Sequence, residues 1–182
     1  MIQESLPWKN DLKKWAFKLE ARMDNYNERT YVTIEKAIFN SAFIMRKLLD
    51  CKTKITTKVS EKVKIRVVRY VVSPKDINLV RRYIQEETMK EVKPNTEEKS
   101  LRFICNLLIH STFFDICHDS HQLIGFFVSS DNKKDKNNNR KSIYYIMIGD
   151  WISAIKMVAN DQITYLSMTL DKENGNYIVK AR

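Results

Sequence analysis

Residues 58–72 read KVSEKVKIRVVRYVV, and this stretch decides the fold class because the pattern of apolar residues changes within it. From position 62 to 67, basic residues alternate with β-branched ones. Alternation with a period of two is typical of a strand that buries one face. The stretch therefore predicts a strand with one basic face.

Both flanks of this strand carry periodic patterns that predict further elements. Upstream, apolar residues at three- and four-residue steps predict helices over about 8–28 and 31–50. Downstream, the patterns predict helices at about 77–88, 96–114 and 150–158, and strands at 123–129, 142–148, 163–170 and 177–180. Asn174-Gly175 is a hairpin-turn signal between the last two strands.

These elements predict one α+β domain over residues 1–182. Its helical, bundle-like N-terminal two-thirds spans about 1–115 and includes the basic strand, and its β-rich C-terminal third spans about 122–182. The longest apolar stretch, 103–114, is about half the roughly 20 residues that a membrane-spanning helix needs. With no secretory signal and an odd number of cysteines, the chain is expected in the cytoplasm with its thiols reduced. The three glycines are isolated, so a phosphate-binding loop is excluded and no cofactor is expected.

The net charge of +10, from 32 basic and 22 acidic residues, is concentrated in two segments. Residues 52–69 hold seven basic side chains against Glu61, and 131–141 hold five against two aspartates. Such segments predict a surface that follows phosphates, although a charge run is often only a solvated face. The predicted nucleic-acid-binding residues are Lys58, Lys62, Lys64, Arg66, Arg69, Lys133, Lys134, Lys136, Arg140 and Lys141. Tyr70, Tyr144 and Tyr145 are candidates for stacking on bases, or for half-buried packing in strands.

Two polar residues lie within the apolar helix predicted at 96–114. Asn106 and His110 are four residues apart and therefore share one helix face, and Arg102 lies two turns before His110. A histidine can exchange protons near neutral pH, and an arginine can bind a phosphate. The structural alternative is a buried Asn/His pair that ties helices together, since buried polar groups need partners.

Residues 101–111, LRFICNLLIHS, resemble the signature helix of the HEPN superfamily of helical proteins. The motif of that family consists of Arg, commonly Asn, three mostly apolar residues and His. In the family, these residues resemble a site that cleaves RNA without a metal. The site is usually completed by a second copy of the chain in a dimer. Asn106 and His110 match the motif, whereas Cys105 stands where the arginine is expected. The resemblance implies that His110 transfers protons, that Asn106 assists it, and that Arg102 replaces the missing phosphate contact.

Three hypotheses follow from these residues. The first is a HEPN-like, RNA-binding protein or endoribonuclease of toxin or defence type that acts as a homodimer, with His110, Asn106 and Arg102 as catalytic residues. The alternative is a non-catalytic module whose basic surface binds nucleic acid, another polyanion or an acidic protein partner. A zinc-dependent enzyme around His118 and His121, in a cluster that includes Cys117, is a third. A structural zinc site needs four ligands, so a solvated loop is the favoured interpretation and no metal is expected.

Overall fold

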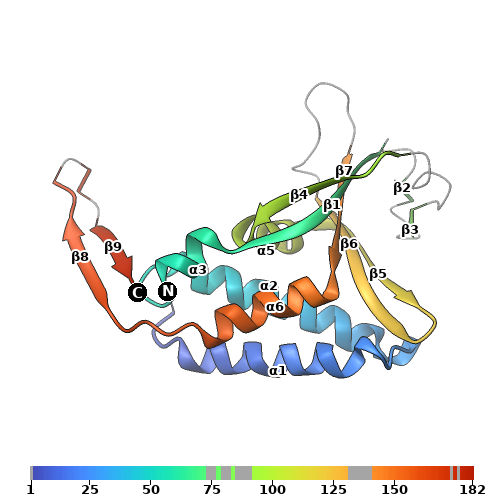
Figure 1. The fold of residues 1–182 in the computed structure, drawn as a ribbon, viewed down its shortest axis with the longest axis horizontal. Coiled ribbons are helices and arrows are strands. Elements are labelled where there is room, and N and C mark those ends of the chain that lie inside the picture. Colours follow the sequence, from blue (N-terminus) through green and yellow to red (C-terminus); the bar gives the residue numbers. More distant parts are fainter. Residues whose placement is uncertain are drawn as a thin grey trace.

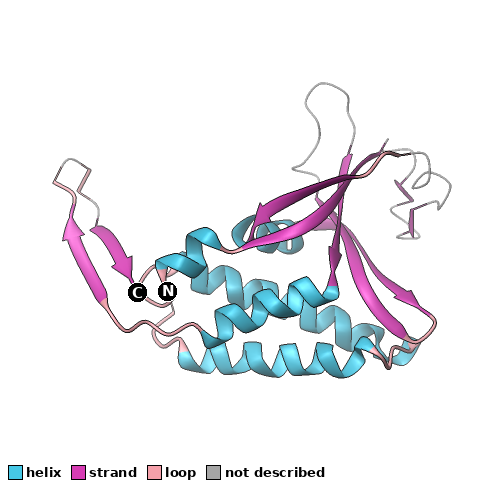
Figure 2. Ribbon diagram, viewed as in Figure 1, coloured by secondary structure: helices cyan, strands magenta, loops and turns pink. Residues whose placement is uncertain are grey.

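The computed structural model describes residues 2–72, 77–78, 83–84, 92–130, 141–172, 174–175 and 177–182. Its helices are α1 (Leu6–Met23), the 3-10 helix η1 (Glu28–Thr30), α2 (Tyr31–Asp50), α3 (Thr57–Lys62), α5 (Leu101–Ile109) and α6 (Ile148–Asn160). Its strands are β1 (Lys64–Val72), β2 (Ile77–Asn78), β3 (Tyr83–Ile84), β4 (Asn95–Ser100), β5 (Ser111–Asp119), β6 (Gln122–Ser130), β7 (Lys141–Met147), β8 (Leu166–Leu170) and β9 (Tyr177–Ala181). The predicted α+β class is confirmed (Figure 2).

A five-stranded antiparallel sheet in the order β4-β1-β7-β6-β5 is the centre of the fold. Helices α1, α2 and α6 form a layer along one side of it (Figure 1). The sheet face toward the helices is apolar because alternate residues such as Ile65, Val67 and Phe126 point into one core. Trp151 of α6 lies at the centre of this core, fully buried, and its indole N–H donates a hydrogen bond of 3.2 Å to Ser41 of α2.

We call the opposite side of the five-stranded sheet the outer face. It carries the alternate residues of each strand, and a small second cluster of Val72, Phe113 and Ile143 is buried there. Two separate two-stranded sheets complete the described structure, β2 with β3 and β8 with β9. The β8–β9 hairpin projects away from the helices (Figure 1), and its turn contains Gly175, whose positive φ of 65° suits the predicted Asn-Gly turn.

The helix predicted at 31–50 is confirmed as α2, and the one predicted at 8–28 is confirmed as α1 except that it ends at Met23. The helix predicted at 96–114 is wrong over about half of its length. Residues 95–100 form β4, only 101–109 are helical, and 111–119 form β5. The run of Thr, Glu, Lys and Ser before the helix pairs with β1, where Glu98 lies opposite Arg66. The helix begins where the Ser100 side chain accepts a hydrogen bond of 3.2 Å from the Phe103 N–H, as an N-cap residue does.

Two further predictions need correction. The basic strand predicted at 58–72 begins with the short helix α3, because the Thr56 side chain caps it by accepting from the Val59 N–H, and extended structure starts at Lys64. The helix predicted at 77–88 is contradicted where the chain is described, since Ile77–Asn78 and Tyr83–Ile84 pair as antiparallel strands. The other residues of that predicted helix, and the loop 131–140, lie outside the described residues.

Candidate nucleic-acid interface

The three predicted catalytic residues lie on or next to α5, but they do not converge on one another. His110 is the exposed C-cap residue of α5, and its backbone N–H donates to the Asn106 carbonyl at 3.1 Å. Arg102 donates to the Asp50 carboxylate at 2.6 Å and also contacts the Leu49 carbonyl. Asn106 accepts a hydrogen bond of 2.5 Å from the Nε of Arg46. The side chains of Arg102 and Asn106 therefore join α5 to α2.

Arg46 is the residue that sequence reasoning missed here. It lies on α2, 60 positions before its partner Asn106, and it also forms an ion pair with Asp50 one turn away. Partial burial alone would raise the pKa of Asp50, but hydrogen bonds from Arg46 and Arg102, together with their charges, outweigh it and lower that pKa. Two guanidinium groups and one carboxylate leave this cluster with one net positive charge.

Cys105, which stands at the position where the HEPN motif has arginine, points into the core. It is fully buried, and burial raises the pKa of its thiol to about 12, against a smaller opposing effect of the charges of Arg46 and Arg102. A charged side chain at this position would have to enter the apolar core. The guanidinium groups of Arg46 and Arg102 both bind the Asp50 carboxylate, close enough for their charges to act on the Cys105 thiol.

The predicted basic surface is divided by the fold. Lys58 and Lys62 on α3, and Lys64 and Arg66 on β1, are exposed, as predicted. Arg69 is half-buried and its Nε donates to Ser142 at 3.0 Å, and Lys141 is only 7% exposed, so these two side chains are not part of an open basic face. Lys133, Lys134, Lys136 and Arg140 lie outside the described residues.

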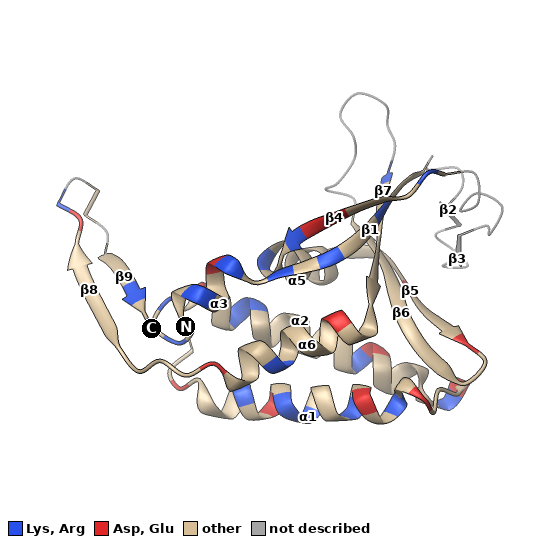
Figure 3. Cartoon of the chain, viewed as in Figure 1, with Lys and Arg blue, Asp and Glu red and all other residues tan. Residues whose placement is uncertain are grey.

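Acidic residues of β4 offset part of the charge of β1. Lys64 lies 3.6 Å from the Glu98 carboxylate, and Glu98 is also directly opposite Arg66. Figure 3 shows acidic positions on β4 and basic positions on β1. Both members of the Lys64–Glu98 pair are more than half exposed, so the pair contributes little to stability. The strand pairing therefore lowers the local positive charge that the sequence alone had indicated.

The outer face carries an aromatic row that is better defined than the basic surface. Tyr70 of β1, Phe127 of β6 and Tyr145 of β7 are each half-buried there. The Phe127 ring lies 5.1 Å from the Tyr145 ring and 5.9 Å from the Tyr70 ring, measured between centroids. Phe127 and Tyr145 are directly opposite each other in the sheet. We call these three side chains the aromatic platform.

Gly125 leaves room for the Tyr145 ring beside its backbone. A Cβ atom built on Gly125 would approach the Tyr145 ring to 2.8 Å and the Ile146 carbonyl oxygen to 2.4 Å. Cys117 is directly opposite this glycine on β5. Burial, followed by the charges of Cys117 and Tyr70, raises the pKa of Tyr145 to about 12. The phenol of Tyr145 is therefore neutral at physiological pH.

Half-buried packing, one of the two roles predicted for the tyrosines, is confirmed for Tyr70 and Tyr145, and stacking on bases stays a prediction. Tyr70 and Tyr145 lie on the outer face, whereas Tyr144 points to the helices, is 4% exposed and packs edge-on against Phe103 at 5.4 Å. Phe127 was not predicted. It becomes a neighbour of Tyr145 only through strand pairing, and no sequence periodicity identifies that neighbour.

The zinc alternative at Cys117, His118 and His121 finds no support where the chain is described. Cys117 and His118 belong to β5 instead of the expected solvated loop. The His118 ring stacks on Tyr26 at 4.2 Å with an interplanar angle of 18°. No cluster of three or more potential metal ligands occurs among the described residues.

None of the described helices is long and apolar enough to cross a membrane. Comparisons with known family models, with curated proteins and with solved structures return no match. The function of the chain must therefore be inferred from its own geometry.

Proposed function

We propose that the protein binds single-stranded RNA on the outer face of its five-stranded sheet. The observation that carries this proposal is the aromatic platform of Tyr70, Phe127 and Tyr145 on three adjoining strands. A sheet that presents neighbouring aromatic rings offers a stacking surface for two or three unpaired bases. Duplex bases are already stacked on one another, so the platform favours a single strand.

Basic side chains lie where the phosphates of such a strand would run. Arg66 precedes Val68 by two residues on β1, and Val68 is directly opposite Tyr145. Arg66 is therefore a diagonal neighbour of the platform on the same face. Lys64 lies two residues before Arg66 on the same face of β1, and both side chains are exposed. The bases would stack on the rings while the backbone passes these cations.

The test is fluorescence anisotropy with a labelled single-stranded RNA and variants that keep apolar volume. Phe127→Leu and Tyr145→Leu remove a ring without emptying the site, and each should weaken binding about fivefold to a hundredfold, since stacking is worth about 1–3 kcal/mol per base. Phe17→Leu is the matched control, because Phe17 lies on α1 and is 72% exposed.

Equal binding by all three variants would refute the platform. Binding that follows only total positive charge, and that duplex RNA or an acidic protein matches, would favour the alternative of a general polyanion surface. A single-stranded DNA of the same sequence shows whether the ribose hydroxyl contributes.

RNA cleavage is a second candidate function, and one contact favours it. Arg46 donates to Asn106, so a guanidinium group stands beside the motif residue even though Cys105 replaces the arginine. We propose His110 as the proton-transfer residue of a metal-independent reaction on this exposed end of α5. RNA should then be cleaved in the presence of EDTA, and His110→Ala should abolish cleavage without changing anisotropy. If neither the parent nor the variant cleaves RNA, this candidate fails while the binding proposal stands.

A further inference from the structure

The β8–β9 hairpin has one apolar face that the rest of the chain leaves largely uncovered. In the pairing register, Leu166 lies opposite Ala181, Met168 opposite Val179 and Leu170 opposite Tyr177, which places all six on one face. Met168 is 52% and Tyr177 58% exposed, and Leu166 and Leu170 are nearly half exposed. A two-stranded hairpin with this much exposed apolar surface is only marginally stable by itself.

The outward edge of β8 also leaves backbone groups without partners in the hairpin. Tyr165 and Arg182 exchange both backbone hydrogen bonds, each 2.9 Å long. Because hydrogen-bonded and non-hydrogen-bonded pairs alternate along an antiparallel ladder, the N–H and C=O groups of Leu166, Met168 and Leu170 point away from β9. In Figure 1, β8 lies on the side of the hairpin away from the helices.

The two edges of the hairpin differ in how they are protected. At β9, the outward N–H of Ala181 donates to the Thr57 hydroxyl of α3 at 3.2 Å, and Lys180 adds a charge. In β8, Leu166–Leu170 contains no charged residue, no proline and no glycine. Natural edge strands normally carry such residues to prevent pairing with another chain. The β8 edge therefore has the features of an edge that pairs with a strand of another chain.

The sequence of β8 identifies the partner that fits it. It reads Leu-Ser-Met-Thr-Leu, so it has the same order of residue types in both directions. A second copy related by a two-fold axis at Met168 would place Leu166 opposite Leu170 of that copy. Apolar residues would then meet apolar residues, and hydroxyl residues would meet hydroxyl residues. A two-fold interface requires this self-complementarity.

We propose that two copies of the chain associate through antiparallel pairing of their β8 strands, which joins their hairpins into a four-stranded sheet with a continuous apolar face. This inference is independent of the proposed function, because the aromatic platform lies on the five-stranded sheet and not on the hairpin. The hydroxyl face of the joined sheet contains Ser167 opposite Thr169 of the second copy. These two positions are suited to a charge test because Thr169 is exposed and Ser167 is half exposed.

The experiment compares two double variants by sedimentation velocity over a range of protein concentrations. Ser167→Glu with Thr169→Glu places like charges opposite each other across the axis, whereas Ser167→Glu with Thr169→Lys places opposite charges there. Both variants carry Ser167→Glu, which faces Lys180 within its own hairpin. Since each cross-strand pair occurs twice in a dimer, the dissociation constants of the two variants should differ about tenfold or more.

The parent chain should sediment with twice its mass of 21.6 kDa at high concentration. The Glu/Lys variant should still dimerise, and the Glu/Glu variant should be monomeric at the same concentrations. A parent that remains monomeric, or two variants with equal dissociation constants, would overturn the proposal. Circular dichroism melting of both variants verifies that each is folded, and unchanged RNA anisotropy separates this test from that of the proposed function.

Discussion

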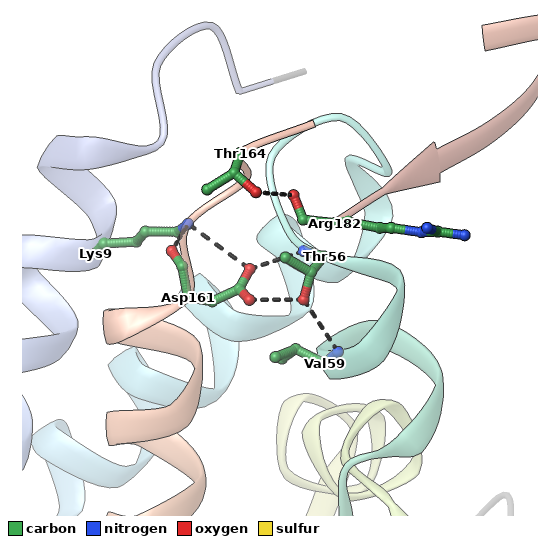
Figure 4. Close-up of polar contacts among 6 residues, drawn as sticks. All are labelled: Lys9, Thr56, Val59, Asp161, Thr164 and Arg182. Atoms are coloured by element: carbon green, nitrogen blue, oxygen red, sulfur yellow. Dashed lines mark hydrogen bonds and ion pairs between the residues drawn. The ribbon is translucent and has the colours of Figure 1, made fainter. Parts of the chain in front are cut away.

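Asp161, directly after α6, connects three separate parts of the chain (Figure 4). Its carboxylate accepts hydrogen bonds of 2.7 Å from the Thr56 backbone N–H and 2.6 Å from the Thr56 hydroxyl. The Lys9 ammonium donates to the Asp161 backbone carbonyl at 2.5 Å and lies 4.0 Å from its carboxylate. Both side chains of this pair are less than a tenth exposed, so each charge depends on the other.

Asp161→Ala should destabilise the fold by about 3 kcal/mol, because it leaves the Lys9 charge and the Thr56 N–H without the carboxylate. Lys9→Met should cost less, about 1 kcal/mol, because it keeps the apolar stem and the Asp161 carboxylate keeps its two hydrogen bonds from Thr56. Urea unfolding at neutral pH measures both. If Lys9→Met is the more harmful substitution, the charge of Lys9 contributes more to stability than its burial costs.

The pH dependence of stability provides a separate test of Lys9. Burial lowers the pKa of Lys9 below 10.5, and the Asp161 charge opposes this only in part. Between the lowered folded value and 10.5 the unfolded chain binds more protons, so the contribution of Lys9 makes the free energy of unfolding rise with pH. This rise should be absent from Lys9→Met. A parent and a variant with parallel profiles over the alkaline range would contradict the assignment.

Cys117 should be chemically inert although it lies beside the aromatic platform. Burial, followed by the charge of Asp115, raises the pKa of its thiol to about 12, and the thiolate is the reactive form. Alkylation with iodoacetamide at about pH 8, close to the ordinary pKa of a free thiol, should leave Cys117 almost unmodified in the native protein, as peptide mass spectrometry would show. The same treatment in denaturant should modify it fully. Rapid native labelling would show that this part of the outer face opens.

At the scale of elements, the chain was predictable where one pattern ran through a whole element. The helix predicted at 31–50 has the same bounds as α2, since a helix buried on a broad face must repeat its apolar residues at helical spacing. The prediction for residues 95–119 was wrong because β4, α5 and β5 follow one another without turn residues between them. The Phe113–Phe114 pair fits a helical stripe as well as a strand with both faces covered.

Gly125 and Gly149 form a matched pair of substitutions at this scale. Gly125→Ala forces a Cβ against the Ile146 carbonyl and the Tyr145 ring, so it should destabilise the fold by about 1–3 kcal/mol and weaken RNA binding. Gly149 lies in α6, where an added Cβ would meet nothing within 4 Å, so Gly149→Ala should stabilise the fold by up to about 1 kcal/mol. Thermal unfolding compares them, and equal effects would contradict the packing of Tyr145 on Gly125.

At the scale of the whole molecule, strand pairing determines what the charge of +10 can do. The alternation of β1 was enough to predict that Lys64 and Arg66 are exposed, because a buried face on one side requires a solvated face on the other. The neighbours of β1 were not predictable, and β4 brings Glu98 beside both cations. The contact between Arg46 and Asn106, which are 60 residues apart, was equally unpredictable from the sequence.

The segment 131–140 is the second source of positive charge, and its contribution is separable. Its flanking residues, Ser130 and Lys141, belong to β6 and β7, which are antiparallel neighbours in the sheet. Continuing their register from Val128 opposite Tyr144 puts Ser130 opposite Ser142, so one residue is needed to pair with Lys141 before the turn. Replacing the segment with Ser-Asn-Gly, in which Ser faces Lys141 and Asn-Gly forms a two-residue hairpin turn, should therefore preserve the fold while removing four basic and two acidic residues. Because each phosphate contact on a single strand contributes about 0.7 to the slope of log K against log salt, that slope should fall by at most about 3.

RNA binding at low salt should survive this replacement, since the aromatic platform stacks bases without any contribution from the segment. The platform variant Phe127→Leu should have the reverse signature, a weaker affinity with an unchanged salt slope, because stacking releases no counterions. Anisotropy titrations at several salt concentrations measure both quantities for both variants. If removing the segment abolishes binding at every salt concentration, charge rather than stacking holds the RNA, and the interface must be centred on 131–140 instead of the sheet.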